Sequence, residues 1–245
     1  MFAPEVQKLG PLNLSDPSVQ TAFRIAFASH PVVDLLVLSS TMNFSTDEEA
    51  NQNASELRAK LSQLSASNIG LSQVFNAAIQ CQIYQVPSHQ AKALEVVPVW
   101  DLHAKRDSAR PYSEGLFVSL LNWFKTDFFS WIDKPRCGQC RALSTTLVNS
   151  KAPPTLQEAK GLATVVELFT CEVCGSLTRF PRFNHPVALL HTRSGRCGEW
   201  SNCFALIATA LGFEIRRVYD SADHVWIEVW MEHRREWVHC DPCEN

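Results

Sequence analysis

The sequence predicts an α+β fold in which a helix is followed by an antiparallel sheet, with a separate lobe where four cysteines bind zinc. Three observations lead to this prediction. Two Cys-x-x-Cys pairs lie in the middle of the chain, a helical pattern begins at Cys197, and strands of alternating apolar and polar residues come after it. With 245 residues, of which 46% are hydrophobic, the chain is long enough to bury a sizeable core.

The first part of the chain differs in composition, because residues 1–68 contain neither cysteine nor tryptophan. Within it, residues 32–40 are interpreted as a buried strand, and Thr46 begins a capping box that opens a helix. The stretch SASN, residues 65–68, is interpreted as a linker. We therefore expect an N-terminal segment, 1–68, without an assigned function, and a second part, 69–245.

Helices are predicted over residues 74–84, 89–97 and 115–132, where apolar residues recur at spacings of three and four. Pro98 is expected to end or kink the second of these helices. The third is too short and too charged to span a membrane, so we interpret it as a core helix. Its side chains available for burial are Leu120, Leu121, Phe124, Phe128 and Trp131.

A helix is predicted over residues 197–211, and Gly212 is suited to cap it. After this helix the spacing of apolar residues changes from that of a helix to that of a strand. The segments FEIRRVYD, DHVWIEVWM and WVHCD predict strands, and the polar segment EHRRE predicts a turn. The second strand has an apolar face made of Val225, Ile227, Val229 and Met231. Its other face carries His224, Trp226, Glu228 and Trp230, the composition of a cleft wall.

Charge and targeting signals exclude some classes of function. The formal charge is −3 without a basic stripe, which argues against nucleic acid as a partner. The N-terminus lacks the pattern of a signal peptide, and no segment is expected to insert into a membrane. In a reducing compartment, nine cysteines favour metal binding and catalysis over a disulfide framework.

The two cysteine pairs have the spacing of a structural zinc site, since two knuckles supply four thiolates in tetrahedral geometry. The predicted ligands are Cys137, Cys140, Cys171 and Cys174. A redox dithiol or buried free thiols are the alternatives. A third pair, Cys240 and Cys243, is left out of the site, because Cys240 lies within a predicted strand on the face opposite Asp241 and should point into packing.

Cys197 at a helix N-terminus is a candidate nucleophile, because the helix dipole stabilises a thiolate there. His224 could activate it, and Asp241 on the next strand could orient the imidazole of His224. A buried structural thiol and a surface histidine remain the alternative at this point. Cys203 falls on the packed side of the same helix and is interpreted as a core residue.

A family resemblance favours the catalytic interpretation. The string RCGEWSNCFALIATALGFEIRRVYD, together with HVWIEVW, EWVHCDPCE, both cysteine pairs and RFPRFNHPVALLHTRSG, resembles the cytosolic peptide:N-glycanases of the transglutaminase-like superfamily, with their papain-like core. The resemblance extends over residues 72–245. It implies a Cys197, His224, Asp241 triad and zinc at the four cysteines named above. Family members continue past the CDPCE string, so the chain is expected to be shortened at its C-terminus.

The resemblance implies hydrolysis of the amide between an asparagine side chain and the first N-acetylglucosamine of an N-glycan. It also implies a cytoplasmic or nuclear location, denatured N-glycoproteins as substrates, a role in degradation, and proteasome-shuttle ubiquitin receptors as partners. Trp226 and Glu228 are candidate sugar-site residues. The rival hypotheses are a cysteine protease, a protein-crosslinking transglutaminase, and a non-catalytic zinc scaffold that recruits degradation factors.

Overall fold

The computed structural model describes residues 81, 83–220 and 223–244. The chain separates into two compact units, Met1–Val86 and Pro87–Asn245. The second unit contains every residue of the predicted zinc site and of the predicted triad.

Several predictions fall outside the described residues. They are the boundary after residue 68, the strand over 32–40, the helix that begins near Thr46, and most of the helix over 74–84. None of the helices in the described part of the chain is long and apolar enough to cross a membrane.

The first helices of the second unit are α5 (Pro87–Val96), α6 (Val99–Lys105) and α7 (Tyr112–Trp123). Pro98 lies between α5 and α6, which confirms that the predicted second helix ends there. A π-helical turn, η1 (Phe124–Phe128), continues α7.

The predicted helix over 115–132 is wrong at its C-terminal end. Its backbone becomes extended at Phe129, with φ −115° and ψ 149°, and the short strand β1 (Ser130–Trp131) comes next. Leu120, Phe124 and Phe128 are buried as expected. Trp131 is 47% exposed instead of buried. Its backbone pairs with that of Gly195 in a short parallel ladder, so Trp131 is not part of the helix and does not lie on its buried face.

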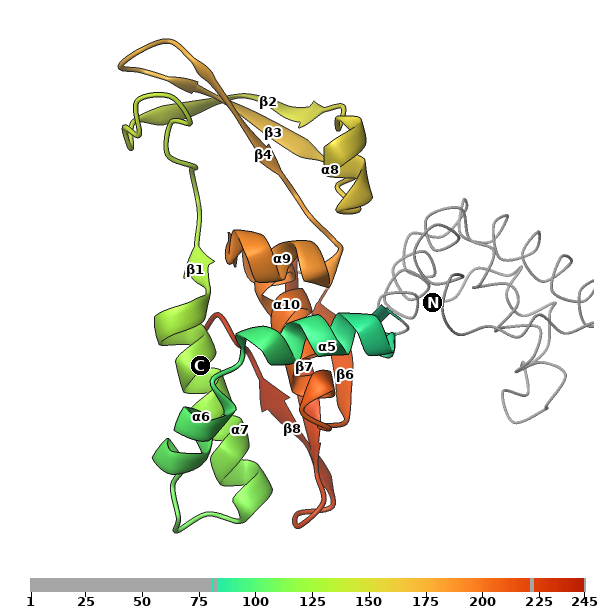
Figure 1. Cartoon of the computed structure of the whole chain (residues 1–245). Coiled ribbons are helices and arrows are strands. Elements are labelled where there is room, and N and C mark those ends of the chain that lie inside the picture. The colour runs from blue at the N-terminus through green and yellow to red at the C-terminus, as the bar shows by residue number, and fades with distance from the viewer. Residues whose placement is uncertain (1–80, 82, 221–222, 245) are drawn as a thin grey trace, which may run out of the picture. The chain divides into compact units, whose positions relative to one another are not determined.

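A three-stranded antiparallel sheet forms the first lobe (Figure 1). Both Cys-x-x-Cys pairs lie at one end of it, since their four sulfurs are within 4.8 Å of one another and Cys171 ends one of the strands. Its strands are β2 (Thr145–Ala152), β3 (Val166–Cys171) and β4 (Leu177–Pro181), in that order across the sheet. The short helix α8 (Leu156–Lys160) connects β2 to β3 and begins with a capping box. In Figure 1 the lobe joins the rest of the unit through the chain after β1 and through the chain between β4 and α9.

A second antiparallel sheet has the order β6 (Ile215–Asp220), β7 (His224–Met231) and β8 (Glu236–Cys240). These three strands and the turn before β8 confirm the strands and the turn that were predicted for the last part of the chain. The predicted apolar face of β7 holds the buried side chains of Ile227 and Val229, each 0% exposed.

The central helix α10 (Cys197–Ala210) comes after α9 (Pro186–Thr192) and the short strand β5 (Ser194–Gly195). It packs against α5, α9 and strand β7, which makes it the core of the unit (Figure 1). Cys203 on α10 is 0% exposed, which confirms its prediction as a core residue. Gly212 lies just past the helix with φ +85°, a left-handed conformation in which glycine is favoured as a cap.

Candidate active site and metal site

The four cysteines of the two pairs form one cluster, with all their Sγ atoms within 4.8 Å of one another. The Cys137 and Cys174 sulfurs are 3.6 Å apart, and those of Cys140 and Cys171 are 3.5 Å apart. Tetrahedral zinc with Zn–S bonds of about 2.3 Å requires sulfurs about 3.8 Å apart. The donor set therefore fits a metal ion of this type with little adjustment.

Local hydrogen bonds prepare the first cysteine pair for a metal. The N–H groups of Gln139 and Cys140 point at the Cys137 sulfur from 3.3 and 3.4 Å. The hydrogen bond with the Ser176 hydroxyl, together with the smaller effect of the Cys140 N–H, lowers the pKa of Cys137 to about 5. A thiolate is the form that binds metal, so Cys137 is in its ligating state at neutral pH.

The cluster as a whole needs a cation to become four thiolates. The N–H of Ala142 lowers the pKa of Cys140, but hydrogen bonds with the thiols of Cys174 and Cys171 outweigh it and raise that pKa to about 12. Like charges at this distance disfavour one another. A bound divalent ion would remove that repulsion, which is why the donor set favours a metal site over free thiols.

The third pair stays outside this cluster, as predicted. Cys240 ends β8 with 3% exposure, and burial raises the pKa of its thiol to about 12. Cys243 instead bonds to Asp241.

Cys197 is the first residue of α10, and Arg196 precedes it as the N-cap. Its side chain is partly exposed, so a reagent can approach it. The unpaired N–H groups at the start of a helix favour negative charge. The position is suited to a thiolate nucleophile.

His224 and Asp241 form a close pair at the end of the second sheet. His224 begins β7 and Asp241 comes directly after β8, so the sheet brings them together. Nε2 of His224 is 2.5 Å from Oδ2 of Asp241. Burial raises the pKa of Asp241, but hydrogen bonds from Cys243 and His224 outweigh it and leave that pKa below its ordinary value. An ionised Asp241 therefore accepts the Nε2–H bond, and Nδ1 is left for other chemistry.

Cys243 also belongs to this site, although the sequence analysis considered it only as part of the third cysteine pair and gave it no role beside Asp241. Its N–H and its thiol both donate to Oδ1 of Asp241, each at 3.0 Å. Burial and the hydrogen bond to Asp241 raise the pKa of the Cys243 thiol, with a contribution from the charge of Cys197, so it remains protonated. The Asp-Pro-Cys spacing is the available signal, because an aspartate often accepts from the N–H two residues on.

The structure brings Cys197 to the same region as the pair. α10 packs against β7, whose first residue is His224. Cys197 is close enough to Cys243 to contribute to the raised pKa of that thiol, and Cys243 bonds directly to Asp241. His224 and Asp241 are therefore in direct contact, and contact between Cys197 and His224 stays a prediction.

The two candidate sugar-site residues lie on the same strand but in different surroundings. The Trp226 ring stacks against His224 with centroids 5.8 Å apart, and the ring of His239 lies 5.4 Å away on another strand. Its indole N–H is buried and finds no hydrogen-bond partner among the described residues. Glu228 forms an ion pair with Arg216 on β6.

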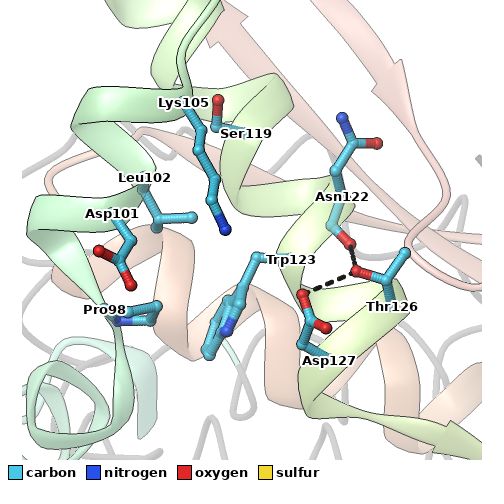
Figure 2. Close-up of a pocket in the computed structure, with 9 residues that line it drawn as sticks. All are labelled: Pro98, Asp101, Leu102, Lys105, Ser119, Asn122, Trp123, Thr126 and Asp127. Atoms are coloured by element: carbon cyan, nitrogen blue, oxygen red, sulfur yellow. Dashed lines mark hydrogen bonds between the residues drawn. The ribbon is translucent and has the colours of Figure 1, made fainter.

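A separate pocket of about 510 Å³ lies between α6 and the α7–η1 segment (Figure 2). Trp123 and Lys105 point into it, and the hydroxyl of Thr126 bonds to Asp127 at its rim. Its complete lining is Pro98, Asp101, Leu102, Lys105, Ser119, Asn122, Trp123, Thr126 and Asp127. None of these residues belongs to the cysteine cluster or to the predicted triad.

Comparisons with known proteins find a sequence similarity over the part of the chain that holds these residues. Residues 135–242 match the model of the transglutaminase-like superfamily, a span that contains both the cysteine cluster and the predicted triad. A solved structure, the periplasmic domain of TgpA from Pseudomonas aeruginosa bound to ethylmercury, aligns with a TM-score of 0.33 and 19% identity, over 66% of this chain and 48% of that one.

Curated relatives share a single name, peptide-N(4)-(N-acetyl-beta-glucosaminyl)asparagine amidase. The protein from Caenorhabditis briggsae is 52% identical over 126 residues, which is 51% of this chain and 21% of the relative. The one from Eremothecium gossypii is 43% identical over 62% of this chain and 44% of the relative. The one from Rattus norvegicus is 36% identical over 91% of this chain and 36% of the relative.

The chain thus spans less than half the length of these relatives. Within that span the identity is 36–52%, and the family model covers the cysteine cluster and the predicted triad. Residues 135–242 are thus similar to the transglutaminase-like superfamily, and the chain is similar in sequence to part of proteins named peptide-N(4)-(N-acetyl-beta-glucosaminyl)asparagine amidase.

Proposed function

We propose that this chain hydrolyses the amide that joins an asparagine side chain to the first N-acetylglucosamine of an N-glycan. The curated relatives are named for this activity. The observation that carries the proposal is the His224–Asp241 pair at 2.5 Å, next to a helix that begins with a partly exposed cysteine.

The reaction has two steps. The Cys197 thiolate attacks the side-chain carbonyl carbon, and the C–N bond breaks as a thioester forms. The imidazolium of His224 gives its proton to the departing glycosylamine nitrogen. His224 then takes a proton from water, whose oxygen attacks the thioester. The products are an aspartate in the protein, the released glycosylamine, and the free Cys197 thiol.

Asp241 takes part through His224. Its carboxylate accepts the Nε2–H bond, which keeps Nδ1 directed away from Asp241 and available to the thiol. The lowered pKa of Asp241 keeps it ionised as His224 gains and loses its proton.

The metal that we propose for the cysteine cluster is one zinc ion with a structural role. Four thiolates complete a tetrahedral site and leave no position for a reacting water. The ligands would be the four clustered cysteines, and the ion would hold the ends of the first lobe together. The proposed reaction takes place at Cys197, His224 and Asp241 and not at the metal.

On the substrate side, we infer that Trp226 contributes an aromatic face to the sugar, since it stacks on the ring of His224. Glu228 would contribute a carboxylate farther along β7. Denatured N-glycoproteins in the cytoplasm or nucleus are the proposed substrates, within glycoprotein quality control and degradation. Proteasome-shuttle ubiquitin receptors are the proposed partners.

A release assay tests the function against its rivals. The chain is incubated with a denatured N-glycoprotein, with the same protein lacking glycans, and with a primary amine and a glutamine peptide. Release of free glycan, abolished by Cys197→Ala, supports the amidase. Peptide-bond cleavage would instead indicate a protease, amine incorporation would indicate a transglutaminase, and a folded chain with none of these activities would support the scaffold hypothesis.

A further inference from the structure

The residues that flank the nucleophile belong to an ion-pair network that reaches into the metal-binding lobe. Arg196 precedes Cys197, and Glu199 lies two residues after it in the first turn of α10. Glu167 lies on β3, the strand that ends at the predicted metal ligand Cys171, and Arg182 comes directly after β4. We call Glu167, Arg182, Arg196 and Glu199 the lobe–helix network.

The central contact is a bidentate pair between Arg196 and Glu167. The two terminal nitrogens of Arg196 donate to the two carboxylate oxygens of Glu167 at 2.9 and 2.7 Å. Such a fork defines both distance and orientation, which a single ion pair does not. The same guanidinium donates to the carbonyls of Ile132 and Asp133, on the chain that leads from β1 to the first cysteine pair.

Arg182 closes the network on the other side. It donates to both oxygens of Glu199 at 2.6 and 2.9 Å and to Glu167 at 3.3 Å. Glu199 also accepts the backbone N–H of Arg196 at 3.0 Å. The start of α10 is therefore bound through side chains to β3 and to the residue that follows β4.

The carboxylates of the network are buried, its arginines are partly exposed, and its charges balance. Glu167 is 8% exposed and Glu199 is 5% exposed, and two guanidinium groups face them. Burial raises the pKa of Glu167, but its bonds and charges with Arg196 and Arg182 outweigh this and leave the pKa below its ordinary value. Buried ion pairs of this kind contribute little net stability compared with apolar packing, but they select one geometry.

Backbone packing adds a second connection at the same place. β5 pairs in parallel with β1, and it ends at Gly195, two residues before the nucleophile. A Cβ atom at Gly195 would lie 2.3 Å from Cβ of Glu199. Only glycine permits this approach, so β5 lies directly against the first turn of α10.

We propose that the lobe–helix network makes the metal-binding lobe a positioning element for Cys197. Arg196 and Glu167 are positioning residues, which set the first turn of α10 relative to His224 through the fork. The inference rests on the proposed function, in which Cys197 is the nucleophile. A metal bound by the four cysteines would have an indirect part, because Cys171 ends β3 and the network joins β3 to the first turn of α10.

Charge-preserving variants test the proposal, because they change geometry without changing the net charge near the thiol. Arg196→Lys removes the bidentate contact, and Glu167→Asp shortens the side chain that carries the carboxylate. In both we expect kcat for a glycopeptide to fall roughly tenfold or more with KM within about twofold, since small misplacements of a nucleophile are costly. Iodoacetamide modification of Cys197 should also slow by roughly tenfold, as the thiolate loses its ordered helix N-terminus.

The matched control is Glu158→Asp. Glu158 pairs with Arg179 inside the same lobe at 2.6 Å and belongs to α8, so its variant should leave Cys197 modification and kcat unchanged. Metal content and the melting temperature are measured for all variants. The double variant Arg196→Lys/Glu167→Asp should be no slower than the slower single variant, because both act through one contact.

The outcomes separate this proposal from the function on which it rests. If iodoacetamide modifies Cys197 at the wild-type rate in the Arg196→Lys and Glu167→Asp variants, and both variants are folded and metal-loaded, the positioning role is wrong. Additive losses in the double variant would also overturn it. If Cys197→Ala retains glycan release, the proposed function fails instead. Should Glu167→Asp not fold, Arg196→Lys and the control still decide the question.

Discussion

The metal-binding lobe and the triad region are built in different ways from the same residue type. In the lobe, cysteines that are close in sequence meet at the ends of one small sheet, and the four sulfurs define the site. In the triad region, Cys197, His224 and Asp241 come from a helix and from the ends of two strands. The first site depends on a local turn geometry, whereas the second depends on the packing of α10 against β7.

These two ways of building a site imply that each region resists different perturbations. The lobe has a small sheet and many exposed side chains, among them Leu147, Val148 and Leu177. A metal is therefore expected to supply much of its stability. The triad region has a buried helix and a buried sheet face, so point changes at its polar end should alter chemistry and leave the fold intact.

Removal of metal ligands should have the greatest consequence. Cys137→Ser/Cys171→Ser should lose bound zinc and unfold the lobe, because metal binding and folding are coupled in small metal sites. Metal analysis would show a fall from about one ion per chain to none, and hydrogen exchange would show lost protection over β2–β4. Cys197→Ser is the control and should keep its metal. Full zinc content in the double variant would overturn the ligand assignment.

Changes in the predicted triad should have the opposite effect to removal of the metal ligands, because turnover should be lost while the fold is retained. Asp241→Asn is expected to lower kcat by roughly 10⁴-fold, as loss of the orienting carboxylate does in other triads. Zinc content and melting temperature should stay near wild type. His224→Ala should slow Cys197 alkylation more than Asp241→Asn does, because His224 is the direct partner of the thiol. The reverse order of alkylation rates would contradict the proposed roles.

Acid should weaken the helical side of the unit through His185. This residue is 6% exposed, and Nδ1 accepts the N–H of Val187 at the start of α9. Burial, with the charges of His89 and Lys92, lowers its pKa from 6.5 to about 4. The folded state therefore binds fewer protons, so its stability is complete above the ordinary pKa and declines as the pH falls from about 6.5 to about 4.

The expected loss is about 3 kcal/mol of unfolding free energy across that window. Urea unfolding at a series of pH values measures this loss of unfolding free energy. The signal that is followed should come from α9 and α10 and not from the lobe. His185→Asn, which keeps a capping acceptor, should flatten the dependence. An unchanged slope in this variant would assign the acid sensitivity to other groups.

A smaller effect is expected at Cys243, which supports Asp241 with a thiol as well as a backbone N–H. Cys243→Ser keeps a donor and should remain within about twofold of wild-type kcat. Cys243→Ala leaves only the N–H, and a lost hydrogen bond to a charged group of about 1.5 kcal/mol corresponds to roughly tenfold. Steady-state kinetics on one glycopeptide compares them. Equal rates for the two variants would show that the thiol bond does not matter.

The same contrast explains what the sequence could predict. Patterns that act over a few residues were sufficient for the cysteine pairs and for the alternation of β7, so the cysteine cluster and the second sheet were predictable. The exposed position of Trp131 was not, because its strand forms only by pairing with Gly195 far along the chain. The contact between Glu167 and Arg196 is equally non-local, and no periodicity in either segment indicates it.

Isotope labelling during glycan release follows the proposed reaction at the bond that it breaks. The chain is incubated with a denatured N-glycoprotein in water enriched in ¹⁸O, and the former glycosylation site is analysed by mass spectrometry. The proposed mechanism predicts free glycan, conversion of the asparagine to an aspartate that carries one ¹⁸O, and no conversion with Cys197→Ala. Glycan release that survives Cys197→Ala, or a folded and metal-loaded wild-type chain that leaves the asparagine glycosylated, would contradict it.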